Sequence, residues 1–229
     1  MIANPRKFYT GLTLMVLFAA VFIAIFMPLF GGKNGLQYLD NLYNSISKGS
    51  ADYIGEVRTQ VQTAAAPELI TLNLIMNSDL QAQRTAPLLE KAGARVRLDG
   101  AALTVSGNIV RILESCLDDA RHMYANDGAA LTAKYGYAEK AVLYNWYSAL
   151  RAMESDLKNQ KQFKVAKLAG LVNQKAVETA YNYYGIKAEK ISDRFWMVLF
   201  SLIFYVAYTL WYGFGIMYLF EGWGMQIEH

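Results

Sequence analysis

The chain has 229 residues, enough for one domain of moderate size with accessory segments. Hydrophobic residues make up 54% of it, charged residues 18%, and the formal net charge is +3. This composition is shifted towards membrane proteins, and the near balance of basic and acidic side chains gives no basis for nucleic-acid binding. Because Cys116 is the single cysteine, an intrachain disulfide scaffold is excluded.

The first apolar segment follows a short tail, residues 1–10, that carries Arg6 and Lys7. Residues 11–30 contain no charge and would span roughly 30 Å as a helix, which matches the hydrocarbon core of a bilayer. A cleaved secretory signal is the alternative interpretation, but such signals have an apolar core of only about 7–15 residues. We therefore expect an uncleaved signal anchor, with the basic tail in the cytoplasm.

Residues 31–194 are expected to form an extracytoplasmic, mainly helical α+β domain. GGKNG at 31–35 is a flexible exit from the membrane. Apolar residues then recur at helical spacing until KGS at 48–50 interrupts them, and the helical composition resumes at 51.

A small β-α-β-β-α unit is predicted over residues 68–126. From Pro67 the period becomes that of a strand. The apolar positions that alternate along this strand are Ile70, Leu72, Leu74 and Met76. Asn-Ser-Asp at 77–79 offers a cap for a helix that reaches Gly93, with Pro87 as a kink or as a second helix start.

A hairpin and a second helix complete this unit. Asp99-Gly100 lies between two alternating runs and favours a type I′ turn. Ser106 or Asn108 can cap the helix that follows, which ends at Asp127-Gly128. Its predicted buried stripe is Ile109, Ile112, Leu113, Cys116, Leu117, Ala120 and Met123.

A helical hairpin is predicted for the rest of the domain. One stripe consists of Val142, Trp146, Ala149, Met153 and Leu157, and the other of Val165, Ala169, Val172, Ala176 and Ala180. The second helix is directed towards the next apolar segment, and we expect it to continue nearly straight into that segment.

The second apolar segment, residues 195–220, is predicted to be a transmembrane helix roughly 39 Å long. It returns the tail 221–229 to the cytoplasm. The expected location is the bacterial inner (plasma) membrane, with the central domain periplasmic or extracellular. Lys187, Lys190 and Arg194 at the entry favour the opposite orientation, and we give priority to the first helix.

Catalytic chemistry has little support in the sequence. Glu114, Asp118 and His122 lie along one helical stripe and could hold a divalent metal, but a solvated polar face has the same appearance. Cys116 falls on a buried stripe, and no nucleophile elbow or phosphate loop is present. We therefore predict no enzymatic activity, no cofactor and no metal.

Two groups of residues are candidates for interactions. Small and aromatic residues in the apolar segments suit helix packing in a membrane: Ala20, Ala24, Tyr208, Trp211, Tyr212, Gly213 and Gly215. Aromatic residues of the domain could line a pocket or an interface: Tyr135, Tyr137, Tyr144, Tyr147, Tyr181, Tyr183 and Tyr184. The simpler interpretation of the second group is core packing together with a belt at the membrane surface.

Three functions are compatible with this organisation. The leading hypothesis is a non-catalytic two-span subunit or scaffold in the lipid bilayer that assembles with other membrane subunits or with itself. The second is a sensor whose external domain binds a small-molecule ligand and signals through a partner. The third is a homo-oligomeric two-span channel, for which the apolar segments offer few polar pore-lining groups.

Overall fold

The computed structural model describes residues 2–64 and 69–225, and the chain divides into two compact units. One unit is Met1–Ser50 with Lys187–His229, and the other is Ala51–Ile186. The second unit is narrower than the range 31–194 expected for the domain, because the helix at 35–50 groups with the apolar helices. Pro67, where the strand pattern is expected to begin, and the tail beyond Met225 lie outside the described residues.

The first unit contains α1 (Pro5–Phe26), α2 (Gly35–Ser50) and α10 (Ile191–Trp223). The second apolar segment, 195–220, is helical throughout, as predicted. The first segment, 11–30, is helical only to Phe26, because the residue before Pro28 disfavours the helical conformation. Asn4 caps α1, its Oδ1 accepting a hydrogen bond from the Lys7 N–H over 3.2 Å. Gly224, at φ +88°, ends α10 in the left-handed conformation that glycine adopts easily.

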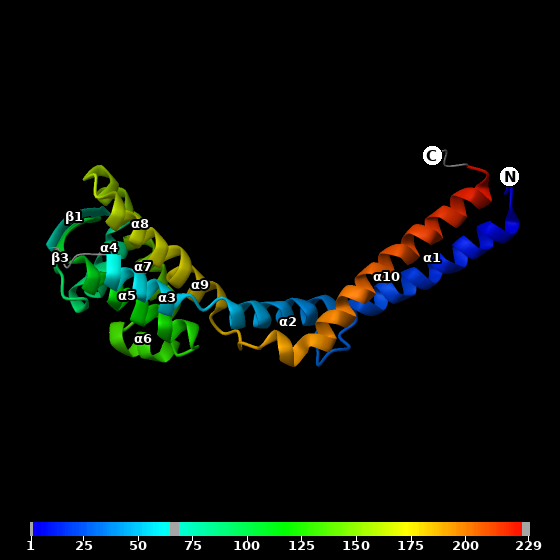
Figure 1. The fold of residues 1–229 in the computed structure, drawn as a ribbon, viewed down its shortest axis with the longest axis horizontal. Helices are drawn as coiled ribbons and strands as arrows, with labels where there is room; N and C mark the ends of the chain where they lie inside the picture. Colours follow the sequence, from blue (N-terminus) through cyan, green and yellow to red (C-terminus); the bar gives the residue numbers. More distant parts are fainter. Residues whose placement is uncertain (1, 65–68, 226–229) are drawn as a thin grey trace. The chain divides into compact units, whose positions relative to one another are not determined.

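Helices α1 and α10 lie side by side and antiparallel (Figure 1). Among their more buried positions, one series in each helix is spaced by three and four residues, which is the pattern of a coiled-coil seam. In α1 these positions are Gly11, Leu14, Phe18, Val21 and Ile25; in α10 they are Ser201, Phe204, Tyr208, Trp211, Gly215, Tyr218 and Gly222. The aromatic segment therefore forms a hairpin with the first helix of the same chain.

The connection from α1 to α2 contains Gly31 and Gly32 at positive φ (61° and 82°), a backbone conformation that glycine adopts readily. The predicted helix break at 48–50 is wrong, because α2 continues to Ser50 and the break falls at 51–53. A tertiary contact supports the last turn: Gly49 lies against the Glu189 backbone, and the Glu189 N–H donates to the Ser45 carbonyl over 3.0 Å.

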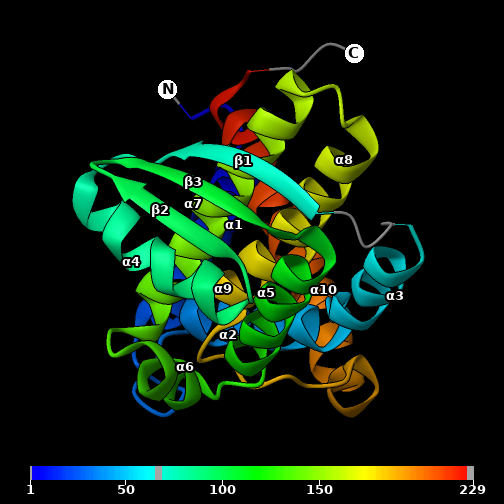
Figure 2. The same cartoon turned by 90° about the vertical axis from the view of Figure 1, so that its left-hand side faces the viewer.

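The second unit contains an antiparallel sheet of β1 (Leu69–Ile75), β2 (Arg95–Asp99) and β3 (Ala102–Asn108) in the order β1-β3-β2. Helices α4 (Asp79–Lys91) and α5 (Ile109–Tyr124) follow the strands as predicted. Figure 2 shows the strands side by side. The predicted alternation of β1 is confirmed, because Ile70, Leu72 and Leu74 are buried and the residues between them are exposed.

Local signals placed most boundaries of this unit correctly. Ser78 caps α4, which is continuous through Pro87, and Asn108 rather than Ser106 caps α5. The predicted turn is displaced by one residue. Asp99 pairs with Ala102, so the loop is Gly100-Ala101. Gly100 has φ +56° and Ala101 does not have a positive φ, which is the type II′ pattern and not the predicted type I′.

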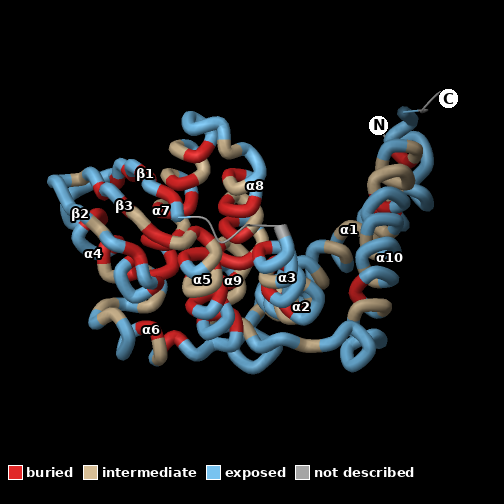
Figure 3. Tube along the Cα trace, turned by 60° about the vertical axis from the view of Figure 1, so that its left-hand side comes forward, coloured by how far each residue is buried: buried red, intermediate tan, exposed pale blue. Residues whose placement is uncertain are grey.

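The helical part of the unit comprises α3 (Ile54–Ala64), α6 (Gly128–Tyr135), α7 (Glu139–Asn159), α8 (Phe163–Val172), the π-helix η1 (Asn173–Val177) and α9 (Glu178–Tyr183). The predicted stripe of α5 and that of α7 are buried in one core (Figure 3). The expected continuous helix into the second apolar segment is wrong. Helix α9 ends at Tyr183, residues 184–190 are not helical, and Gly185 takes φ +84°.

Candidate functional site

A groove runs between α7 and the segment formed by α8, η1 and α9. It consists of two cavities of about 510 and 340 Å³ that share Tyr147 and Glu178 in their walls. The larger cavity is lined also by Arg151, Lys167 and Asn173. The smaller cavity is lined also by Leu143, Tyr144, Val177, Tyr181 and Asn182.

Helical spacing explains how these side chains meet. On α7, Tyr144, Tyr147 and Arg151 follow one another at three and four residues and therefore lie on one face. The facing segment runs in the opposite direction: Tyr181 lines the same end as Tyr144, while Gly170 lies against Glu154 at the other end. A Cβ at Gly170 would be 2.9 Å from Glu154 Oε2, so a larger residue there would displace this carboxylate.

The π-helix lies in the middle of this wall. The Glu178 N–H donates to the Asn173 carbonyl, a bond across five residues, so one residue more than in an α-helix is accommodated. Asn173 is only 5% exposed, and its Oδ1 has no hydrogen-bond partner among the described residues. Buried side-chain amide oxygens normally accept a hydrogen bond, so this oxygen is an exception among the buried polar groups.

The two ends of the groove differ in charge. The smaller cavity has three tyrosines and the carboxylate of Glu178, and no salt bridge in the described part of the chain uses that carboxylate. The larger cavity has Arg151 and Lys167, together with the shared Glu178 and with Glu154, which is bound to Lys158 over 2.6 Å. The cations that line the groove therefore all lie at the end of the larger cavity.

Cations of the chain already contact these rings. Arg151 Cζ lies 5.6 Å from the Tyr147 ring centre, and Arg151 Nη1 donates to the Tyr147 hydroxyl over 3.1 Å. Lys140 Nζ lies 5.9 Å from the ring centres of both Tyr181 and Tyr184. The Tyr144 and Tyr147 rings are stacked with centres 6.2 Å apart.

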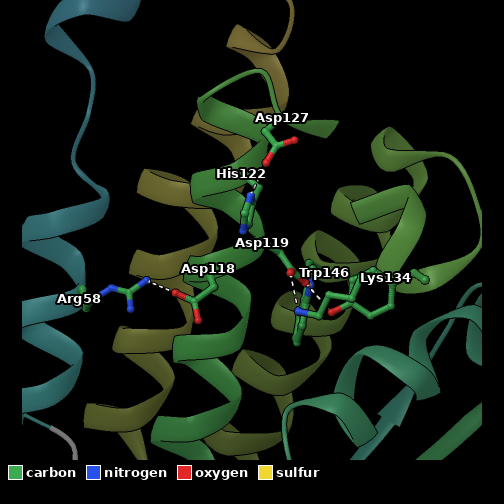
Figure 4. A network of polar contacts seen from close by, with 8 residues as sticks. Arg58, Asp118, Asp119, His122, Asp127, Lys134 and Trp146 are labelled. Carbon is green, nitrogen blue, oxygen red and sulfur yellow. Dashed lines mark hydrogen bonds and ion pairs between the residues drawn. The ribbon is translucent and has the colours of Figure 1, made fainter. Parts of the chain in front are cut away.

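Asp119, on α5, is the centre of a separate polar network (Figure 4). Its carboxylate is 1% exposed and accepts hydrogen bonds from Trp146 Nε1 (2.8 Å), the Tyr135 hydroxyl (2.6 Å) and Lys134 Nζ (2.7 Å). Burial, and then the hydrogen bond to Asp119, raise the pKa of Tyr135 well above its ordinary value. These bonds fix α5, α6 and α7 to one another.

The three residues considered as metal ligands, Glu114, Asp118 and His122, each bind a different residue of the chain. Glu114 accepts from Gln62 over 2.9 Å, Asp118 is paired with Arg58 over 2.5 Å, and His122 with Asp127 over 2.8 Å. The described residues contain no group of three or more potential metal ligands. Burial raises the pKa of the Cys116 thiol well above its ordinary value, so the thiolate is disfavoured.

The other domain aromatics have packing roles. Tyr137 donates to the Arg84 carbonyl over 3.0 Å, and its ring lies 6.4 Å from that of Tyr135. Tyr183 packs edge-on against Tyr124, with ring centres 6.5 Å apart. Of the seven predicted tyrosines, Tyr144, Tyr147 and Tyr181 are the ones that line the groove.

Some of the residues proposed for membrane packing lie in the contact between α1 and α10, and others are exposed. The Tyr208 hydroxyl donates to the Phe18 carbonyl (3.1 Å), Trp211 Nε1 donates to the Leu14 carbonyl (3.0 Å), and Gly215 lies against Met15. A Cβ added at Gly213 would have no described atom of another residue within 4 Å, and Ala20 is exposed. Ala24 is half-buried, and the exposed Tyr212 ring reaches Phe18 at 5.3 Å.

Comparison with known proteins gives no relative. No protein-family description, curated protein or solved structure matches the chain significantly. The function is therefore inferred from the geometry alone.

Sequence reasoning missed Asp119, Arg151, Asn173 and Glu178. Asp119 lies three residues after Cys116 and next to Ala120, so its position at the edge of a buried stripe was the available signal. Helical periodicity places Glu178 on the solvated face of its helix. Periodicity does not show which helix packs against that face, so the groove could not be predicted from it.

Proposed function

We propose that the chain is a two-span membrane subunit that holds the domain Ala51–Ile186 outside the bilayer. In this proposal, α10 associates with another membrane protein or with a second copy of the chain. The proposal has no catalytic component.

The apolar helices support a membrane location. The most apolar stretches of α1 and α10 have mean hydropathies of 2.3 and 1.6, and only 6% and 0% of these stretches are buried. The core helix of a water-soluble protein would be largely covered by its own chain. Such bare apolar helices of sufficient length instead suit a lipid environment.

The observation that carries the assembly proposal is the open face of α10. Tyr205, Thr209 and Gly213 follow one another at four-residue spacing and are all exposed. Tyr205 is 69% exposed near the middle of α10, and its hydroxyl has no partner in the described chain. A tyrosine at this depth is unusual because the aromatic belt lies at the interfaces, and an unpaired hydroxyl in hydrocarbon is unfavourable. A neighbouring helix that approaches at Gly213 would supply a partner.

The assembly is tested by extraction in a mild maltoside, followed by mass determination of the intact particle and identification of its components. We expect a particle that contains more than one polypeptide. Recovery of the chain as a monomer under several mild conditions would contradict assembly.

The proposed topology places both termini in the cytoplasm of a bacterial inner membrane. The antiparallel pairing of α1 and α10 supports both ends lying on one side. In a Cys116→Ser background, Asn126→Cys should react with an impermeant maleimide in spheroplasts, and Ala3→Cys only after lysis. The reverse labelling pattern would invert the orientation without affecting the assembly proposal.

Ligand sensing is a second candidate because the groove between α7 and α9 provides a site. The break at 184–190 shows that α9 and α10 are separate helices. A signal from the groove to α10 could therefore not pass along one continuous helix and would need another route. Thermal-shift screening of the full chain with small metabolites tests this candidate, and no stabilising compound would count against it.

A further inference from the structure

We propose that the groove binds a small zwitterion that carries a quaternary ammonium group at one end and an anionic group at the other. The ammonium group occupies the cavity of Tyr144, Tyr147, Tyr181 and Glu178, and the anion faces Arg151. This proposal is independent of assembly through α10.

The tyrosine end has the chemistry of a cation site. Ring faces attract cations through their quadrupole, and a quaternary ammonium, which has no hydrogen to donate, is bound well by such faces. Glu178 adds a full negative charge and is half-buried without a salt-bridge partner among the described residues. Lys140 lies 5.9 Å from the centre of the Tyr181 ring, at the outer limit of cation–π distance. The Tyr181 ring can therefore still attract the cation of a ligand.

The basic end lies one helical turn away. Arg151 follows Tyr147 by four residues, about 6 Å along the helix axis, and uses one of its guanidinium donors for the Tyr147 hydroxyl. The remaining donors can bind a phosphate or carboxylate in bidentate fashion. Lys167 lines the same cavity and adds a second positive charge. The carboxylates in this lining are Glu154, which is bound to Lys158, and Glu178, which faces the ammonium group in this proposal.

Asn173 lies in the wall of the larger cavity at 5% exposure. Its buried Oδ1 is an acceptor, so Arg151 and Lys167 are the groups that bind the anion. Because a lone cation or a lone anion would leave one end of the groove unused, a zwitterion is the best match.

The test uses the full chain in maltoside micelles, with phosphocholine as the probe and saturation-transfer NMR of its methyl protons as the readout. Choline lacks the anion, and 3,3-dimethylbutyl phosphate replaces the cation by a neutral group of the same shape. We expect phosphocholine to bind at least about fivefold more tightly than either. Equal binding of 3,3-dimethylbutyl phosphate, or absence of saturable binding, would overturn the proposal.

Variants separate the two ends. Tyr181→Leu keeps apolar bulk but removes the ring, and should weaken phosphocholine binding roughly 2- to 30-fold, as should Glu178→Gln. Arg151→Gln should reduce the preference for phosphocholine over choline. Glu90→Gln, an exposed carboxylate on α4, is the matched control and should have no effect. Circular dichroism checks the fold of each variant, and unchanged binding in folded Tyr181→Leu and Glu178→Gln would refute the assignment.

The zwitterion could be free or part of a lipid. Binding of free phosphocholine is compared between the chain in phosphatidylcholine nanodiscs and the chain in phosphatidylglycerol nanodiscs. Loss of this binding in phosphatidylcholine alone would identify the lipid headgroup as the ligand. Equal binding in both would identify a free solute. Both results support the same site.

Discussion

The indole Nε1 of Trp146 donates a hydrogen bond to Asp119 Oδ2 over 2.8 Å in the interior of the domain. Both side chains are almost completely buried, at 0% and 1% exposure. The same oxygen accepts from the Tyr135 hydroxyl, so two donors from different helices depend on one carboxylate. This relationship has direct consequences for stability.

Asp119→Ala should lower the free energy of unfolding by about 2–4 kcal/mol, because the substitution removes the acceptor of the buried Trp146 indole and of the half-buried Tyr135 hydroxyl. Urea unfolding of the full chain in detergent, followed by the fluorescence of Trp146 and the other tryptophans, measures the change. Asp118→Ala is the control. Its ion pair with Arg58 is exposed, and its removal should cost less than about 1 kcal/mol. Equal effects at the two adjacent positions would contradict the buried network.

Alkaline pH should destabilise the domain. Burial and the bond to Asp119 raise the pKa of Tyr135, so the folded state favours the neutral phenol while the unfolded state ionises near pH 10. The resulting stabilisation is present below pH 10 and is lost as the pH rises above it. Burial also raises the pKa of Tyr124, to about 12, and acts in the same direction between pH 10 and 12.

Tyr135→Phe tests the origin of this pH dependence. The variant should be less stable at pH 7 by about 1 kcal/mol, and its stability should fall less steeply above pH 10 than that of the wild type. Chemical unfolding at several pH values gives both quantities. Parallel pH profiles for the two proteins would show that Tyr135 is not responsible.

The edge of the sheet is protected by α7. Asp156 accepts a hydrogen bond from the Asn73 N–H over 3.0 Å, and Gln160 donates to the Thr71 carbonyl over 2.9 Å. The double substitution Asp156→Ala with Gln160→Ala should expose the backbone of β1 and promote association between sheets. Faster hydrogen exchange in residues 69–75 and a concentration-dependent increase in sedimentation are expected. Lys158→Ala, on the same helix, should change neither.

Gly215 and Gly213 are a matched pair within α10. A Cβ at Gly215 would lie 2.8 Å from Met15 Sδ, whereas a Cβ at Gly213 would have nothing within 4 Å. Gly215→Leu should therefore disrupt the pairing of α1 and α10 and cost about 1–3 kcal/mol in a dodecylsulfate titration. Gly213→Leu should leave that titration unchanged and reduce the mass of the extracted particle. The opposite assignment of the two effects would contradict the open face proposed for α10.

The sequence by itself determined the local structure of this protein. Alternation identified β1, the spacing of residues 109–123 identified the buried face of α5, and the two charge-free segments identified α1 and α10. Each of these signals depends on neighbours within one element, where the helical or strand period fixes which side chains share a face. The same local information placed the caps at Ser78 and Asn108.

Only the tertiary structure decided which faces meet. The seam between α1 and α10 joins residues about 190 positions apart, so it was Gly215, and not Gly213, that proved to be covered by the chain itself. Glu178 and Tyr147 line one cavity because the segment from α8 to α9 packs against α7, and Asp119 became a buried acceptor because α6 and α7 brought their donors to it. Contacts between distant elements depend on packing in three dimensions, which the periodicity of one segment does not encode.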